Sequence, residues 1–163
     1  MYYPLFIFEG VAFVNYQIQE ELERHIVFNA AKKEAERLGL PLVNYGCKGM
    51  NPFASESDLN LDIEYRDVPN FKLIAPDGEI PLPDNSGVVY ASHVLEHVND
   101  PEKVLNEMRR VGPTYVVGPN ILSLFNWINP RHKWIVTEKG LVENPSSFAF
   151  PFVLGLNVLA LIV

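Results

Sequence analysis

The first clear pattern along the chain is a helical one. From residue 16 to residue 38, apolar residues recur at steps of three and four, and charged residues fill the opposite face. The recurring apolar residues are Ile18, Leu22, Ile26, Ala30, Ala31, Ala35 and Leu38. This spacing predicts an amphipathic helix over 16–38, which ends at Gly39 and Pro41 because neither residue continues a helix.

Short apolar runs with strand-like composition follow the helix. They cover residues 41–45, 59–63, 71–74, 88–91 and 115–117, of which 71–74 is the weakest. Before the last run, Asp100 and Pro101 open a second helix, with aspartate as the N-cap and proline at the first helical position. Strands that alternate with helices predict an α/β fold, a Rossmann-like, mostly parallel sheet with flanking helices.

The length of the chain allows one domain. At 163 residues and 48% hydrophobic content it can bury a real core, but it is too short for two domains of ordinary size. We divide this single domain, 1–163, into an N-terminal segment with the amphipathic helix (1–39), a central core (40–135) and an apolar C-terminal tail (136–163).

The tail holds sixteen residues from Phe148 onward without a charge. That is a little under the ~17–25 residues that span a bilayer as a helix, and Pro151 shortens the helical part further. We therefore favour a buried strand or helix, while a protein or membrane contact through the tail stays open. The N-terminus lacks the basic region of a secretion signal, so we expect a cytoplasmic protein.

Charge narrows the choice of partners. The formal net charge is −7, and residues 51–100 hold ten acidic side chains against only Arg66 and Lys72 as basic ones. Such a surface repels a phosphate backbone, so we exclude nucleic acid as the main partner and expect a small-molecule or protein partner instead. The single cysteine, Cys47, excludes an internal disulfide and agrees with a reducing compartment.

Candidate binding residues lie where the predicted strands end. In parallel sheets, ligands bind beyond the carboxyl ends of the strands. Gly46 follows the first strand, where a residue without Cβ lets the backbone approach a ligand, although Gly-Cys-Lys-Gly also suits an ordinary turn. Asp62 ends the second strand, where a carboxylate can accept both hydroxyls of a ribose or simply face solvent.

Four stretches together resemble a known family. They are VNYGCKGMN, SDLNLDI, IPLPDNSGVVYASHVLEHVNDPEKVLNEMRRVG and VVGPN. In order and spacing they are similar to class I S-adenosylmethionine-dependent methyltransferases, especially the subgroup whose fourth strand runs into a Leu-Glu-His helix. The resemblance covers about residues 40–135, and its strongest part is 90–111.

The resemblance implies S-adenosylmethionine as the cofactor and assigns roles within the core 40–135. The glycine loop approaches the amino-acid part of the cofactor, Asp62 holds the ribose and Asp77 holds the adenine amino group. The end of the fourth strand lines the pocket near the methyl group. The cofactor-binding residues that it implies are Asn44, Gly46, Cys47, Gly49, Asp62, Asp77, Ser92 and His93.

The sequence also departs from the family pattern. Asn44 stands where an acidic residue is usual, and Lys48 or Met50 occupies the place of another glycine. Ser86 and Gly87 replace a Phe-Asp pair. The two strands and the helix that follow the fifth strand in the family have no counterpart, so we expect a minimal version of the fold.

The histidines after the fourth strand could serve as a base or as metal ligands. His93 and His97 are four residues apart, which on a helix would place both on one face. No third ligand of suitable type is evident, so we predict no metal site. We expect His93 to line the pocket and to act as general base, because histidine titrates near neutral pH.

Residues 126–134, NWINPRHKW, gather two tryptophans and three basic or titratable side chains. They form either a flap that binds the acceptor or an aromatic cap on the sheet.

Two functions follow from these observations. The first is methyl transfer from S-adenosylmethionine to a small-molecule or protein acceptor. The alternative is a catalytically inactive methyltransferase-like domain that acts as a structural or assembly subunit, held in an oligomer or a larger complex. A nucleotide-binding oxidoreductase is weaker, because nothing resembles the last glycine of the dinucleotide fingerprint.

Overall fold

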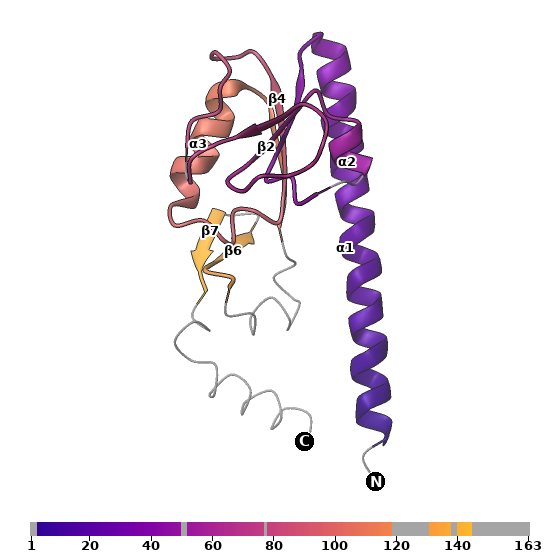
Figure 1. Ribbon diagram of the computed structural model, residues 1–163. Coiled ribbons are helices and arrows are strands. Elements are labelled where there is room, and N and C mark those ends of the chain that lie inside the picture. Colours follow the sequence, from indigo (N-terminus) through magenta and orange to yellow (C-terminus); the bar gives the residue numbers. More distant parts are fainter. Residues whose placement is uncertain (1–2, 50–51, 77, 119–130, 138–139, 145–163) are drawn as a thin grey trace.

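The computed structural model describes residues 3–49, 52–76, 78–118, 131–137 and 140–144, with side chains of the first helix from residue 21 onward. The elements are α1 (Tyr3–Leu38), β1 (Leu42–Tyr45), α2 (Pro52–Ser55), β2 (Leu59–Asp62), β3 (Phe71–Leu73), β4 (Val88–Ser92), α3 (Pro101–Val111), β5 (Thr114–Val117), β6 (Trp134–Thr137) and β7 (Gly140–Glu143). Figure 1 shows a sheet between α1 and α3, with the β6–β7 pair beside one end of it.

The main sheet has five strands in the order β3-β2-β1-β4-β5, and every pair is parallel. This confirms the predicted α/β, Rossmann-like fold and all five predicted strands. The chain moves outward from β1 to β3 and then returns to place β4 on the other side of β1. The carboxyl ends of β1 and β4 therefore meet at a topological switch point, where open α/β sheets bind ligands.

An apolar cluster covers each face of the sheet, because successive strand residues point to opposite faces. On the face toward α1 the buried residues are Phe28, Ala31, Ala35, Leu42, Phe53, Val88, Tyr90 and Val117. On the face toward α3 they are Val43, Tyr45, Leu61, Ile74, Ile80, Val89, Ala91, Leu95, Val104, Met108 and Val111. The central strands are thus buried on both sides, as a parallel sheet requires.

Helix α1 packs on β1, β4 and β5 with a stripe that matches the predicted one only in part. Leu22 and Ile26 were assigned to its apolar face, but both are 59% exposed. The buried stripe runs through Ala31 and Ala35, which were predicted, and through Phe28, which was not. The reason is aromatic packing, since the ring of Phe28 lies 4.9 Å from that of Phe53 and 5.1 Å from that of Tyr90.

The helix also begins earlier than predicted, at Tyr3 rather than at residue 16. Its apolar first half lacks the two-sided pattern on which the prediction rested. Pro4 is no obstacle, because proline is tolerated in the first turn of a helix. This half of α1 projects beyond the sheet in Figure 1.

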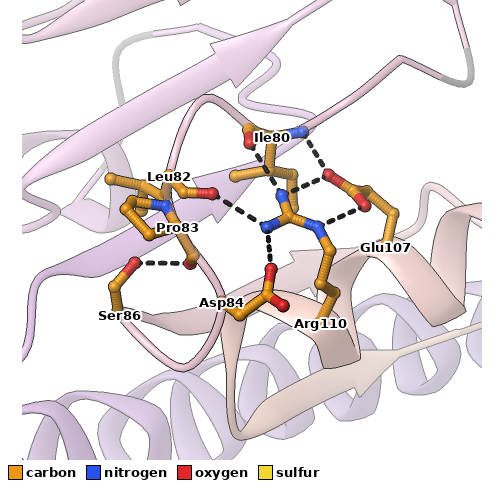
Figure 2. A network of polar contacts seen from close by, with 7 residues as sticks. All are labelled: Ile80, Leu82, Pro83, Asp84, Ser86, Glu107 and Arg110. Atoms are coloured by element: carbon orange, nitrogen blue, oxygen red, sulfur yellow. Dashed lines mark hydrogen bonds and ion pairs between the residues drawn. The ribbon is translucent and has the colours of Figure 1, made fainter.

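Arg110 of α3 fastens the turn-rich connection between β3 and β4, as Figure 2 shows. Its guanidinium donates hydrogen bonds to the carbonyls of Ile80 and Leu82 at 3.1 and 3.0 Å and contacts Asp84 at 2.7 Å. Glu107, one turn away, binds Arg110 at 2.7 Å and accepts from the Ile80 amide at 2.7 Å. The hydrogen bond from Arg110 lowers the pKa of Glu107 below its ordinary value.

Beyond the main sheet, β6 and β7 form an antiparallel pair that was not predicted. Most of this hairpin lies in the segment that the sequence analysis assigned to the apolar tail. Residues 145–163, the remainder of that tail, lie outside the described part of the chain. Among the described residues, no helix is both long enough and apolar enough to cross a membrane.

The aromatic contact between α1 and the sheet leads to a first prediction. Replacing Phe28 with alanine should lower the free energy of unfolding by about 3–5 kcal/mol, because the residue is 2% exposed and its ring packs against those of Phe53 and Tyr90. Ile26→Ala on the same helix is the matched control and should change stability by less than about 0.5 kcal/mol, because Ile26 faces solvent. Urea unfolding measures both variants, and equal losses would contradict this packing.

Candidate functional site

The glycine loop after β1 is shaped by a contact with β4. Gly46 has φ 79°, which favours glycine, and a Cβ there would collide with the side chain of Val94. Val94 belongs to the turn that follows β4. Gly46 is therefore required by the close approach of two protein segments, which join at the switch point of the sheet.

The first amides of the loop point into the protein. The N–H groups of Gly46 and Cys47 both donate to the carbonyl of Leu61 in β2, at 2.8 and 3.1 Å. Burial, together with the negative charge of Asp62, raises the pKa of the Cys47 thiol to about 11. At Gly49 the surroundings are different, because a Cβ there would meet nothing within 4 Å. The loop is thus packed at its start and open at Gly49.

Asn44 takes part in a buried polar network. Its amide donates to the side chain of Asn60 at 2.9 Å, and Asn60 donates to the carbonyls of Ala54 and Pro69 at 2.9 and 2.8 Å. These bonds join β1 to β2, α2 and the segment before β3. The network accounts for an amide at this place in the strand, where the family pattern has an acid.

Asp62 lies at the carboxyl end of β2 and is 8% exposed. Its Oδ1 accepts from the amide of Glu64 at 3.0 Å, and its Oδ2 pairs with Nε of Arg66 at 3.3 Å. Arg66 also contacts the carboxylate of Glu64 at 2.8 Å. The sequence analysis named Asp62 but missed Arg66, although a basic residue four positions after a candidate carboxylate was a visible signal.

The chain turns sharply after β4. Ser92 ends the strand, and His93 adopts φ 56°, a left-handed conformation that histidine reaches more easily than most residues. The Leu-Glu-His residues that follow form a turn, and α3 begins after them at its Asp100 cap, as predicted. His93 and His97 therefore do not share a helical face.

Glu96 lies in this turn with no exposed surface. Its Oε1 is 3.1 Å from Nδ1 of His93 and 4.0 Å from Nε2 of His97. The ring of His97 in turn lies 5.0 Å from that of His132. His132 was placed in the candidate flap 126–134, but its contact with His97 was not predicted, because thirty-five positions separate the two residues.

Backbone contacts hold residues 131–134 against the turn. The amide of Lys133 donates to the carbonyl of Glu96 at 2.7 Å, and Nε1 of Trp134 donates to the carbonyl of Val98 at 3.2 Å. Nζ of Lys133 donates to the side chain of Asn99 at 2.7 Å. This end of the predicted 126–134 segment thus packs on the turn, while residues 126–130 lie outside the described part of the chain.

Three of the predicted positions gather at one edge of the sheet. The loop at Gly46 and Cys47, the carboxylate of Asp62 and the turn at His93 follow β1, β2 and β4. Asp77 lies outside the described residues, so its predicted role stays a prediction. A hollow of about 520 Å³ opens between the segment after β3 and α3, and none of the predicted residues gathered at the sheet edge lines it. Its lining residues are Gly78, Glu79, Asp100, Glu102, Lys103, Asn106, Glu107 and Arg110.

Comparison with known proteins gives one finding. The sequence model of a family described as a methyltransferase domain matches residues 48–112. The match includes Asp62 and the turn with Glu96, begins just after Gly46 and Cys47, and covers less than half of the chain. No curated protein and no solved structure matches the chain. The central segment is therefore similar to a methyltransferase domain, in agreement with the parallel, Rossmann-like sheet.

The raised pKa of Cys47 gives a second prediction. In the unfolded chain the thiol ionises near its ordinary value of 9.0, whereas in the folded protein it ionises only near 11. The stability that this difference provides is fully present below pH 9 and is lost as the pH rises through about 11, since the unfolded state releases its proton first.

Urea unfolding at several pH values, with Cys47→Ala as the comparison, measures this effect. Between pH 9 and 11 the wild-type protein should lose stability more steeply than the variant. Parallel curves over that range would show that the thiol titrates normally and that its burial has no such consequence.

Proposed function

We propose that the chain binds S-adenosylmethionine at the carboxyl ends of β1, β2 and β4 and passes its methyl group to a small-molecule or protein acceptor. The observation that carries this proposal is the sheet itself, in which Gly46, Asp62 and His93 follow three adjacent strands around one switch point. The similarity of residues 48–112 to a methyltransferase domain supports it.

The residues present fit the ribose of this cofactor. Asp62 is a nearly buried carboxylate at the end of β2, where it can accept hydrogen bonds from two hydroxyls. Arg66 contacts one of its oxygens in this structure. The guanidinium of Arg66 lies at the surface, so it can turn outward when hydroxyl groups replace it. Cofactor binding therefore competes with the Asp62–Arg66 pair.

The cofactor supplies a methyl group already activated by its positive sulfur, so the protein needs no nucleophile. The chain has to align the acceptor and, for a hydroxyl or amine, remove its proton. His93 is the base in this proposal. The carboxylate of Glu96, 3.1 Å from Nδ1, orients the ring and would stabilise its protonated form, so proton transfer uses Nε2.

The acidic surface of the central segment supports an acceptor other than nucleic acid. Residues 51–100 combine ten acidic with two basic side chains. A polyanionic substrate would be repelled during approach, and a neutral or basic acceptor would not.

One observation favours the alternative of a non-catalytic assembly subunit. The amides of Gly46 and Cys47 are both bound to Leu61, and Asn44 is bound to Asn60. These groups hold the protein together, as they would in a fold that no longer binds a cofactor. Titration with S-adenosylmethionine separates the two functions.

The third prediction concerns cofactor affinity. Asp62→Ala should weaken binding of S-adenosylmethionine and S-adenosylhomocysteine by tenfold or more, about 1.4 kcal/mol, since it removes a charged hydrogen-bond acceptor. Arg66→Ala should tighten binding by roughly two- to fivefold, because a partly buried ion pair of about 1 kcal/mol no longer has to be broken. Calorimetric titration measures both effects.

Arg37→Ala is the matched control. Arg37 forms a comparable pair with Glu34 on α1, and its loss should leave cofactor affinity unchanged. Unchanged affinity in Asp62→Ala would remove Asp62 from the site. Absence of binding to the wild-type protein at millimolar ligand would support the assembly function instead.

A further inference from the structure

The carboxylate of Glu96 is an unusual feature of the described core. It has no exposed surface, and among the described residues its side chain contacts histidine rings, which carry a charge only when protonated. A buried carboxylate requires compensating charge, because desolvation disfavours its ionised form. The groups around Glu96 should therefore include one that can balance its negative charge.

The groups around Glu96 are imidazole rings. Oε1 lies 3.1 Å from Nδ1 of His93 and 4.0 Å from Nε2 of His97. One ligand atom each from Glu96, His97 and His132 can be chosen so that all three lie within 4.8 Å of one another. The cluster thus offers one carboxylate oxygen and two imidazole nitrogens, facing one point from two separate segments.

The orientation of His97 suits a metal ligand. Its Nδ1 lies 3.0 Å from the carbonyl of Arg131, which can only accept, so Nδ1 carries the proton. In the neutral ring this leaves the lone pair on Nε2, the nitrogen that lies toward Glu96. A second ring nitrogen bound to a backbone carbonyl is the usual arrangement behind a metal-ligating histidine.

Backbone hydrogen bonds fix the position of His132 next to the turn that holds Glu96. The side chain of Asn144 donates to the carbonyl of His132 at 2.9 Å, and the amide of Lys133 donates to the carbonyl of Glu96 at 2.7 Å. The position of His132 is thus fixed by main-chain hydrogen bonds, which do not use its ring nitrogens.

From this geometry we propose that Glu96, His97 and His132 bind a divalent transition-metal ion of the zinc class. Two imidazoles and a carboxylate with an open fourth position form a common zinc ligand set. Ligands around a tetrahedral ion with bonds of about 2.0–2.1 Å lie roughly 3.3 Å apart, so the ion would draw the cluster inward by about 1 Å. The site does not depend on the proposed cofactor.

The test is zinc binding to the full chain, freed of metal with a chelator and carrying no polyhistidine tag. Calorimetric titration with Zn²⁺ should show one equivalent bound at micromolar affinity or tighter. Co²⁺ should give the visible absorption of a tetrahedral site with nitrogen and oxygen ligands. Both titrations are done without S-adenosylmethionine, so their outcome is independent of the proposed function.

The chain offers a matched set of variants. His97→Gln and His132→Ala should each lower zinc affinity at least about tenfold. His25→Ala removes the one histidine of the four that lies outside the His93–Glu96–His97–His132 group, on α1, and should leave affinity unchanged. Circular dichroism confirms folding. His97→Gln keeps the test valid if His132→Ala fails to fold, because the His97 side chain is 44% exposed and glutamine is similar in size.

Three results would overturn the proposal. The first is no binding of Zn²⁺ or Co²⁺ at 100 μM. The second is a folded His97→Gln variant with wild-type affinity, which would place any bound ion elsewhere. The third is binding of Mg²⁺ in preference to Zn²⁺, which would contradict coordination by imidazole nitrogen.

Discussion

The burial of β4 on both faces is the constraint on which the rest of the molecule depends. A parallel strand at the centre of a sheet needs cover on each side, and the alternation of its residues decides what covers it. Tyr90 points toward α1 and meets Phe28, while Val89 and Ala91 point toward α3. Polar side chains can enter only where the strand ends, at Ser92 and His93. The polar groups that β4 contributes to the candidate site therefore lie at its carboxyl end, beside those that follow β1 and β2.

Glu96 links this end of the sheet to the distant segment 131–134 through both its main chain and its side chain. Its carbonyl accepts from Lys133, and its carboxylate lies among three histidines from both segments. Because one residue serves both contacts, the position of His132 and the compensation of the buried charge cannot vary independently. A ligand that binds at the turn after β4 would therefore also affect the position of residues 131–134.

The sequence predicted the sheet well because its strands are short apolar runs separated by turns, a local signal. On α1 it predicted the burial of Ala31 and Ala35 but wrongly added Leu22 and Ile26, which continue the periodic pattern. It missed Phe28, because the aromatic contacts of that ring are tertiary and do not show in the spacing. It missed the contact of His132 with His97 for the same reason. Asp62 was recognisable from its place at a strand end, but its pairing with Arg66 depends on the path of the loop that follows.

The glycine after β1 and the carboxylate after β2 differ in how strongly they indicate a bound cofactor. Gly46 is required by the contact with Val94 whether or not a ligand binds, so a glycine there carries no information about a cofactor. Asp62 is different, because a carboxylate that is 8% exposed needs partners for its charge. Arg66 provides one from the surface, where it is easily displaced, and hydroxyl groups could provide others. The case for binding at this edge therefore rests on the carboxylate after β2 more than on the glycine after β1.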